Sequence, residues 1–93
     1  MSEEIKSPYR VGNKVFVRTV TYHYTGEIVI ADGGGIVLKD AAWIADSGRF
    51  SDALKTGEFS EVEPYPDDVA VLLCFGAIVD VADWKHDLPR KQK

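Results

Sequence analysis

The sequence predicts a small, mainly all-β domain: five short antiparallel strands curled into a barrel, with one short helix inserted between the third and fourth strands. Three observations support this fold class. Residues 11–44 are rich in β-branched and aromatic residues, which fit a pleated sheet. Single glycines interrupt the apolar runs, as expected of strands that bend sharply. Residues 69–81 form a second, almost wholly apolar run. The length of the chain predicts that residues 1–93 form a single domain with one modest core.

The first three strands are predicted within residues 11–44. The first covers residues 15–22, and Gly26 marks a bend or bulge before the second at residues 27–31. Asp32 and the three glycines after it predict a tight hairpin, since glycines supply the positive φ angles that such turns use. The return strand then begins at residue 36.

Residues 45–68 are expected to form an insertion that contains the helix. Apolar residues at helical spacing, Phe50 and Leu54 among them, predict a helix over about residues 47–56, and Gly57 stands where it would end. A helix this short is not stable alone in water. We therefore expect Phe50 and Leu54 to dock on the sheet.

The run at residues 69–81 supplies the fourth and fifth strands, separated at Gly76. Its first seven residues have no polar side, so the strand requires cover on both faces. Two alternatives could cover the second face of this strand: a second copy of the chain, which we favour, or the helix at residues 47–56. The predicted self-association interface comprises apolar side chains of this run: Val69, Val71, Leu72, Leu73, Phe75, Ile78 and Val79.

Charge is distributed unevenly along the chain. The whole chain has a formal net charge of −4, and residues 19–83 carry 12 acidic and three basic residues. Such an acidic body disfavours indiscriminate binding to phosphate backbones, so any nucleic-acid contact should lie near the ends, where residues 1–18 and 84–93 carry net charges of +2 and +3. Residues 1–10 are expected to be a flexible or briefly helical N-terminus that frays or crosses the barrel mouth. Residues 85–93 form a basic tail. The simpler explanation of the positive charge at the two ends is that both are solvated termini with no nucleic-acid partner.

Cellular location is predicted from what the sequence lacks. It has no apolar run of the roughly 18 residues that a transmembrane helix needs, and its start lacks the apolar core of a signal peptide. Its single cysteine, Cys74, forms no internal disulfide. We expect a cytoplasmic protein with no membrane partner.

Residues for catalysis are sparse, so we expect no enzyme and no cofactor. His23 and His86 are the only histidines, and no catalytic triad, Cys-His pair or zinc motif can be assembled from them and Cys74. Four residues at helical spacing raise the alternative of a cation site: Asp80, Asp83, His86 and Asp87. A charged helix-cap region is the favoured interpretation, and no metal is predicted.

Two stretches resemble the motifs of the Sm-like (LSm) family. The first consists of Val11-Gly12, Tyr24-Thr25-Gly26, Asp32 and Ile36–Asp40, and the second of Leu72–Val79. Together they cover about half of the chain. Residues 46–50 are similar to an insertion in uncharacterised bacterial and phage proteins of this kind. The resemblance implies an Sm-like or SH3-like barrel whose fourth strand pairs with the fifth strand of a neighbouring copy, which generates a ring.

The resemblance also implies binding of single-stranded RNA, although three pocket positions differ. Glycines replace the family's stacking residue and asparagine in the hairpin, and Phe75 replaces an arginine. The first hypothesis is a homo-oligomeric ring that binds RNA or single-stranded nucleic acid. The second is a structural or assembly protein, such as one from a phage, that makes only protein contacts. The predicted nucleic-acid contacts are Lys14, Arg18, Lys39, Phe75, Arg90, Lys91 and Lys93.

Overall fold

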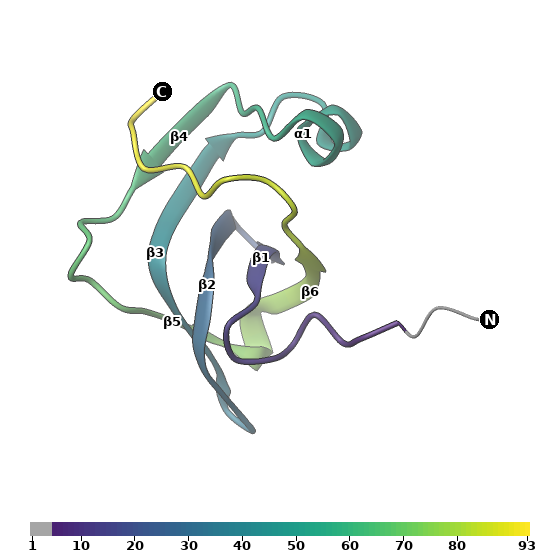
Figure 1. Ribbon diagram of the computed structural model, residues 1–93, viewed down its shortest axis with the longest axis vertical. Coiled ribbons are helices and arrows are strands. Elements are labelled where there is room, and N and C mark those ends of the chain that lie inside the picture. Colours follow the sequence, from purple (N-terminus) through teal and green to yellow (C-terminus); the bar gives the residue numbers. More distant parts are fainter. Residues whose placement is uncertain (1–4) are drawn as a thin grey trace.

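A computed structural model describes residues 5–93 (Figure 1). Its elements in chain order are β1 (Lys14–Thr19), β2 (His23–Asp32), β3 (Gly35–Asp46), α1 (Phe50–Thr56), β4 (Glu61–Pro64), β5 (Val71–Cys74), the 3₁₀ turn η1 (Phe75–Ala77) and β6 (Ile78–Asp83). Every strand pairing is antiparallel. The predicted mainly β class with one short helix is confirmed. The structure has six strands instead of five, because the insertion contributes β4. Within residues 5–93, no helix is long and apolar enough to cross a membrane.

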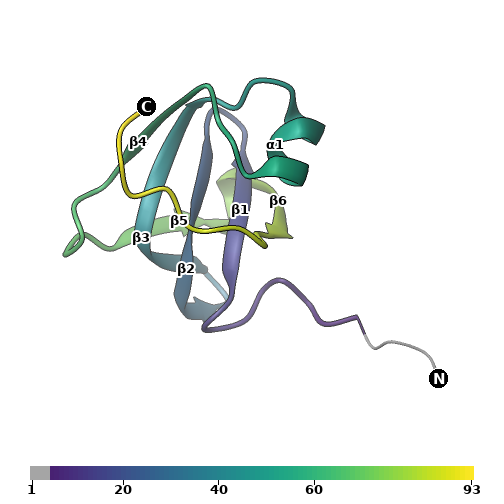
Figure 2. The ribbon, with the colours of Figure 1, turned by 45° about the horizontal axis from the view of Figure 1, so that its top comes forward.

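The barrel is organised around β3, which is long enough to pair with three other strands. β2 lies along one side of it, while β5 pairs with its first part and β4 with its last. Between these parts, Asp40 has a φ of +49° and the strand bends. η1 then joins β5 to β6, and β6 pairs with β1. Five strands therefore wrap around one interior, and Figure 2 shows β5 and β6 crossing β1, β2 and β3.

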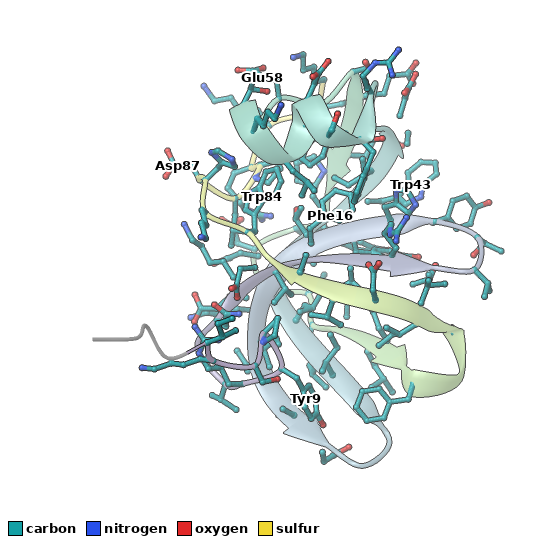
Figure 3. All side chains as sticks on the ribbon, turned by 90° about the vertical axis from the view of Figure 1, so that its right-hand side faces the viewer. Tyr9, Phe16, Trp43, Glu58, Trp84 and Asp87 are labelled. Atoms are coloured by element: carbon teal, nitrogen blue, oxygen red, sulfur yellow. The ribbon has the colours of Figure 1, made fainter. Side chains whose placement is uncertain are left out.

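Two apolar clusters lie on opposite faces of β1. Val15 and Val17 point into the barrel, whereas Phe16 points outward, and all three are fully buried. The barrel cluster comprises Val15, Val17, Ile28, Ile36, Leu38, Ala41 and Leu73. The outer cluster comprises Phe16, Ala42, Ile44, Ala53, Phe59, Val62 and Trp84. Figure 3 shows Phe16 and Trp84 between α1 and the strands. The insertion and the C-terminal segment thus cover the outer face of β1.

Helix α1 docks as predicted, with Phe50 and Leu54 packed against the outer cluster. It starts at Phe50 instead of residue 47, because the Asp46 carboxylate accepts a hydrogen bond from the Gly48 N–H at 2.8 Å and stabilises a turn there. Its predicted end is confirmed: Gly57 has a φ of +77° and donates its N–H to the Ala53 carbonyl.

The first strand was predicted to run too far. It ends at Thr19, and a turn stabilised by the Thr19 hydroxyl, which accepts the Tyr22 N–H at 3.0 Å, leads into β2. Gly26 therefore lies inside β2 instead of before it. The bulge predicted there is confirmed, because the register with β3 shifts between Thr25 and Glu27. A Cβ at Gly26 would lie 2.9 Å from the Leu38 Cβ, so the close approach of β3 requires glycine.

The hairpin at residues 32–35 is confirmed, but for a different reason from the one predicted. Gly33 and Gly34 have no positive φ; instead the Asp32 carboxylate accepts the Gly34 N–H at 2.8 Å. Gly35 has a φ of +157°, and a Cβ there would lie 2.2 Å from the Leu73 carbonyl oxygen. The third glycine therefore lets β5 pass close to the start of β3.

Both terminal segments pack onto the barrel. Within residues 5–10 there is no helix, and Tyr9 packs against the barrel cluster and donates its hydroxyl to the Asp32 carbonyl. Residues 1–4 of the predicted N-terminal segment lie outside the described residues. The C-terminal segment (yellow in Figure 1) runs back to β4, where Val62 and Lys93 exchange two main-chain hydrogen bonds of 2.9 Å.

Candidate self-association and nucleic-acid interfaces

An apolar row, exposed at its two ends and partly buried at its centre, crosses three strands on the outside of the barrel. Ile30 on β2 is opposite Val37 on β3, which in turn is opposite Leu72 on β5. Residues directly opposite in antiparallel strands point to the same face. Leu72 is 61% exposed and Ile30 is 51% exposed. We call these three residues the apolar row.

The residues predicted for self-association divide into two groups. Leu73 is 7% exposed and belongs to the barrel cluster. Val71 and Ile78 are partly buried and pack against this cluster. Four are at least one-third exposed: Val69, Leu72, Phe75 and Val79. The helix is not the cover of β5, because its buried residues belong to the outer cluster with Phe16. The first group is therefore core, and only the second is accessible to a partner.

Two strand edges carry no further strand within residues 5–93. β5 pairs only with β3, and β6 pairs only with β1. The outer edge of β4 differs, because the C-terminal segment bonds to it through Lys93 and Val62. An open edge presents main-chain N–H and C=O groups that can pair with another chain.

The predicted nucleic-acid contacts do not gather on one face. Five of the six cations already have a partner, as follows: Lys14 donates to the His86 carbonyl, Arg18 pairs with Asp80, Lys39 with Glu27, Arg90 with Asp67 and Lys93 with Glu58. Lys91 is exposed, with no ion pair among residues 5–93. Phe75 is 39% exposed and lies next to the hairpin between β2 and β3, where its N–H donates to the Gly34 carbonyl, and its ring centroid is 5.2 Å from that of Tyr9.

Arg18 and Asp80 form an ion pair on the surface, joined by more than one hydrogen bond. Their side chains lie opposite each other on β1 and β6, and the guanidinium carbon lies 4.8 Å from the centroid of the Phe50 ring. The hydrogen bonds from Arg18 hold the pKa of the Asp80 carboxyl below its ordinary value. His23 is in register with Arg18, and its pKa is lowered, first by burial and then by the Arg18 charge.

The structure separates the side chains considered for catalysis or metal binding. Asp80 and Asp83 belong to a strand, so the helical spacing assumed for the cation site is wrong. Asp83 accepts from Asn13 at 2.8 Å, while the His86 ring lies 2.8 Å from the Leu54 carbonyl. Because a carbonyl only accepts, His86 must donate through Nε2. Across residues 5–93, no three His, Cys, Asp or Glu side chains are grouped to hold a metal ion.

An aromatic groove beside β4 was not predicted from the sequence. The groove has a volume of about 310 Å³ and is lined by Trp43, Glu63, Pro64, Tyr65 and Pro66. The Tyr22 ring, which does not line the groove, packs nearly perpendicular to the Trp43 indole at a centroid distance of 5.3 Å. Figure 3 shows Trp43 to one side of Phe16, remote from Tyr9. The Pro64-Tyr65-Pro66 motif was the available signal, because prolines on both sides of an aromatic residue rigidify a loop; the Tyr65 ring itself is partly buried and packs against the barrel cluster.

Comparison with protein-family models, with curated proteins and with solved structures finds no significant match. A barrel of this kind is compatible with many functions. The features that bear on function are therefore the open strand edges, the apolar row, the charges and the groove.

Proposed function

We propose that this protein is a non-catalytic assembly module that forms a homo-oligomer through β5 and β6. The observation that carries the proposal is the exposure of Leu72 and Val79, 61% and 58%, on the two strands whose outer edges are open. Large apolar side chains beside an unpaired edge favour strand addition, since main-chain hydrogen bonds and apolar burial then act together.

The proposed contact joins the β5 edge of one copy to the β6 edge of the next. Such a contact is head-to-tail, because each copy contributes a different surface, and repetition closes into a ring when the rotation permits. The resemblance to the Sm-like family supports the same arrangement. The covered β4 edge supports the choice of strands, because the chain protects that edge and leaves β5 and β6 available.

The charges favour contacts with protein over contacts with RNA. Five of the six predicted cations are engaged within the chain, and residues 19–83 are strongly acidic. Nonspecific phosphate binding needs several free Lys or Arg side chains. RNA binding remains a second candidate because of one observation: the exposed Phe75 ring, edge-to-face with Tyr9, offers a stacking surface for a base.

Self-association is tested by light scattering after size-exclusion chromatography, over protein concentrations from low micromolar to millimolar. The wild type should elute as an oligomer. Leu72→Asp and Val79→Asp should each yield folded monomer, because the substitution buries an unpaired carboxylate in the interface. Val11→Asp is the matched control, since Val11 is 65% exposed but precedes β1. A monomeric wild type, or an oligomer unaffected by both substitutions, would overturn the proposal.

RNA binding is tested separately with labelled oligouridine at low salt. The assembly proposal expects no binding. Salt-sensitive binding that is lost in Phe75→Ala would instead establish the second candidate. Lys91→Gln is the suitable charge variant, because Lys91 is exposed. Arg90 is unsuitable: its guanidinium donates to two main-chain carbonyls, so a loss of binding could reflect a loss of structure.

A further inference from the structure

We propose that the groove lined by Trp43, Glu63, Pro64, Tyr65 and Pro66, here named the Trp43 groove, binds a lysine or arginine side chain of a basic partner peptide. This site lies on β3 and β4 and is separate from the apolar row and from the open edges of β5 and β6. The inference adds a partner-binding surface to the proposed homo-oligomer and does not depend on it.

The walls of the groove are fixed by contacts within the protein. Trp43 and Glu63 are directly paired on β3 and β4, so a carboxylate lies beside the indole. The Tyr65 N–H donates to the Ala41 carbonyl at 2.8 Å, and Arg90 donates to the Tyr65 carbonyl at 2.8 Å. Pro64 and Pro66 fix φ on both sides of Tyr65. A preformed site spends little conformational entropy on binding.

The indole presents ring carbons to the groove, and no donor. Trp43 Nε1 has essentially no accessible surface, and no acceptor is within hydrogen-bonding distance of it in residues 5–93. A neutral proline-rich peptide offers carbonyl acceptors, for which this buried N–H is out of reach. A cation is attracted instead by the electron-rich face of the ring, and tryptophan is the best aromatic residue for this interaction.

The charge around the groove selects for a basic ligand. Residues 61–68 contain four acidic residues and no basic one. Arg90 pairs with Asp67 at 2.6 Å and offsets one of these charges, so residues 61–68 and Arg90 together carry a net charge of −3. Such a potential attracts lysine and arginine and repels phosphate groups. The same charge makes RNA a poor occupant of this groove.

The proposal is tested by titrating the full chain with three capped octapeptides and following tryptophan fluorescence. One probe carries three arginines separated by glycines, the second has citrulline in place of arginine, and the third is all proline. Trp84 is only 2% exposed, so a change on binding should come from Trp43. The arginine peptide should bind about tenfold or more tightly than the citrulline peptide, and its binding should weaken with salt.

Variants assign the binding to the groove, with isothermal calorimetry as the readout because it does not need Trp43. Trp43→Ala should weaken arginine-peptide binding about 5- to 30-fold, and Glu63→Gln should weaken it severalfold. Asp52→Asn is the matched control, because it removes one acid from α1, away from the groove, and should leave affinity unchanged. Circular dichroism verifies that each variant is folded.

Three results would overturn the proposal: no binding of the arginine peptide at millimolar concentration, equal or tighter binding of either neutral peptide, or unchanged binding in a folded Trp43→Ala protein. Tighter binding of the proline peptide than of the arginine peptide would identify the groove as a docking site for proline-rich segments. Leu72→Asp should not alter arginine-peptide affinity, and Trp43→Ala should not alter oligomer mass. Failure of this proposal is therefore distinguishable from failure of the self-association proposal.

Discussion

The guanidinium of Arg90 donates a hydrogen bond of 2.8 Å to the main-chain carbonyl of Tyr65. The same side chain donates to the Ala41 carbonyl at 3.1 Å and to the Asp67 carboxylate at 2.6 Å. One cation thus joins the bend of β3, the loop after β4 and the C-terminal segment. Arg90 holds one wall of the Trp43 groove in place and stabilises the fold.

Replacement of Arg90 should therefore reduce stability. Arg90→Gln removes charge-assisted hydrogen bonds from two carbonyls, and we expect the free energy of unfolding to fall by about 1.5–3 kcal/mol. Urea denaturation followed by circular dichroism measures the loss. Lys91→Gln is the control, since an exposed neighbour should change stability by less than about 0.5 kcal/mol. Equal effects in the two variants would show that the Arg90 contacts contribute nothing.

The crossing of β5 over the start of β3 predicts a contrast between two glycines. Gly35→Ala places a Cβ 2.2 Å from the Leu73 carbonyl oxygen at a φ unfavourable to alanine, and should cost about 2–4 kcal/mol. A Cβ at Gly33 meets no atom of residues 5–93 within 4 Å and φ there is not positive, so Gly33→Ala should be near neutral. Thermal unfolding compares them, and a Gly35→Ala protein as stable as Gly33→Ala would contradict the close approach.

Two buried threonines should respond oppositely to the same substitution. The Thr25 hydroxyl is fully buried with no hydrogen-bond partner in the described part of the chain, so Thr25→Val should raise stability by about 1 kcal/mol. The Thr19 hydroxyl accepts the Tyr22 N–H at 3.0 Å and donates to the Tyr22 carbonyl. Thr19→Val should therefore cost about 1–3 kcal/mol. Calorimetric melting temperatures test this, and a destabilised Thr25→Val would disprove it.

Stability should fall in two steps as the pH is lowered. The folded-state pKa of His23 is depressed by burial and by Arg18, so its contribution is full above the unfolded value near 6.5 and is lost as pH falls through the folded value. The pKa of Asp80 is also depressed, by hydrogen bonds from Arg18, and its contribution is lost below about pH 4.

Variants separate these two steps in urea midpoints measured from pH 8 to pH 3. His23→Gln should remove the step below pH 6.5, and Asp80→Asn should remove the acid step and lower stability at neutral pH. Both effects should be small, because both side chains are partly solvated. A step below pH 6.5 that persists in His23→Gln would assign it to another group.

The strand content was predictable because local preference and tertiary packing agree over most of the chain. β-Branched runs form β1, β2 and β3, and Gly57 ends α1 where the helical spacing predicted. Prediction was poorer where side-chain hydrogen bonds decided a boundary. Thr19 ends β1 early, and Asp46 delays the helix by stabilising a turn. Such short-range bonds compete with the regular pattern and leave a weak signal in hydrophobicity.

The candidate sites were less predictable, because they depend on residues far apart in sequence. The apolar run at residues 69–81 was correctly identified as unusual, yet its division into core Leu73 and exposed Leu72 required the register with β3. The sequence predicts Arg90 as a phosphate contact, but the folded chain brings two carbonyl partners to it from 25 and 49 positions away. The Trp43 groove arises only where β4 pairs with β3.

By itself, the sequence determined the mainly β class, the hairpin at Asp32, the docking face of the helix and the acidic character of the body, because composition, spacing and turn residues are local properties. Only the tertiary structure decided which apolar residues remain exposed, which cations are already paired and which aromatic residues share a groove. These features depend on strand register and on contacts between distant segments. A shift of one residue in register exchanges the inward and outward faces of a strand without changing its composition.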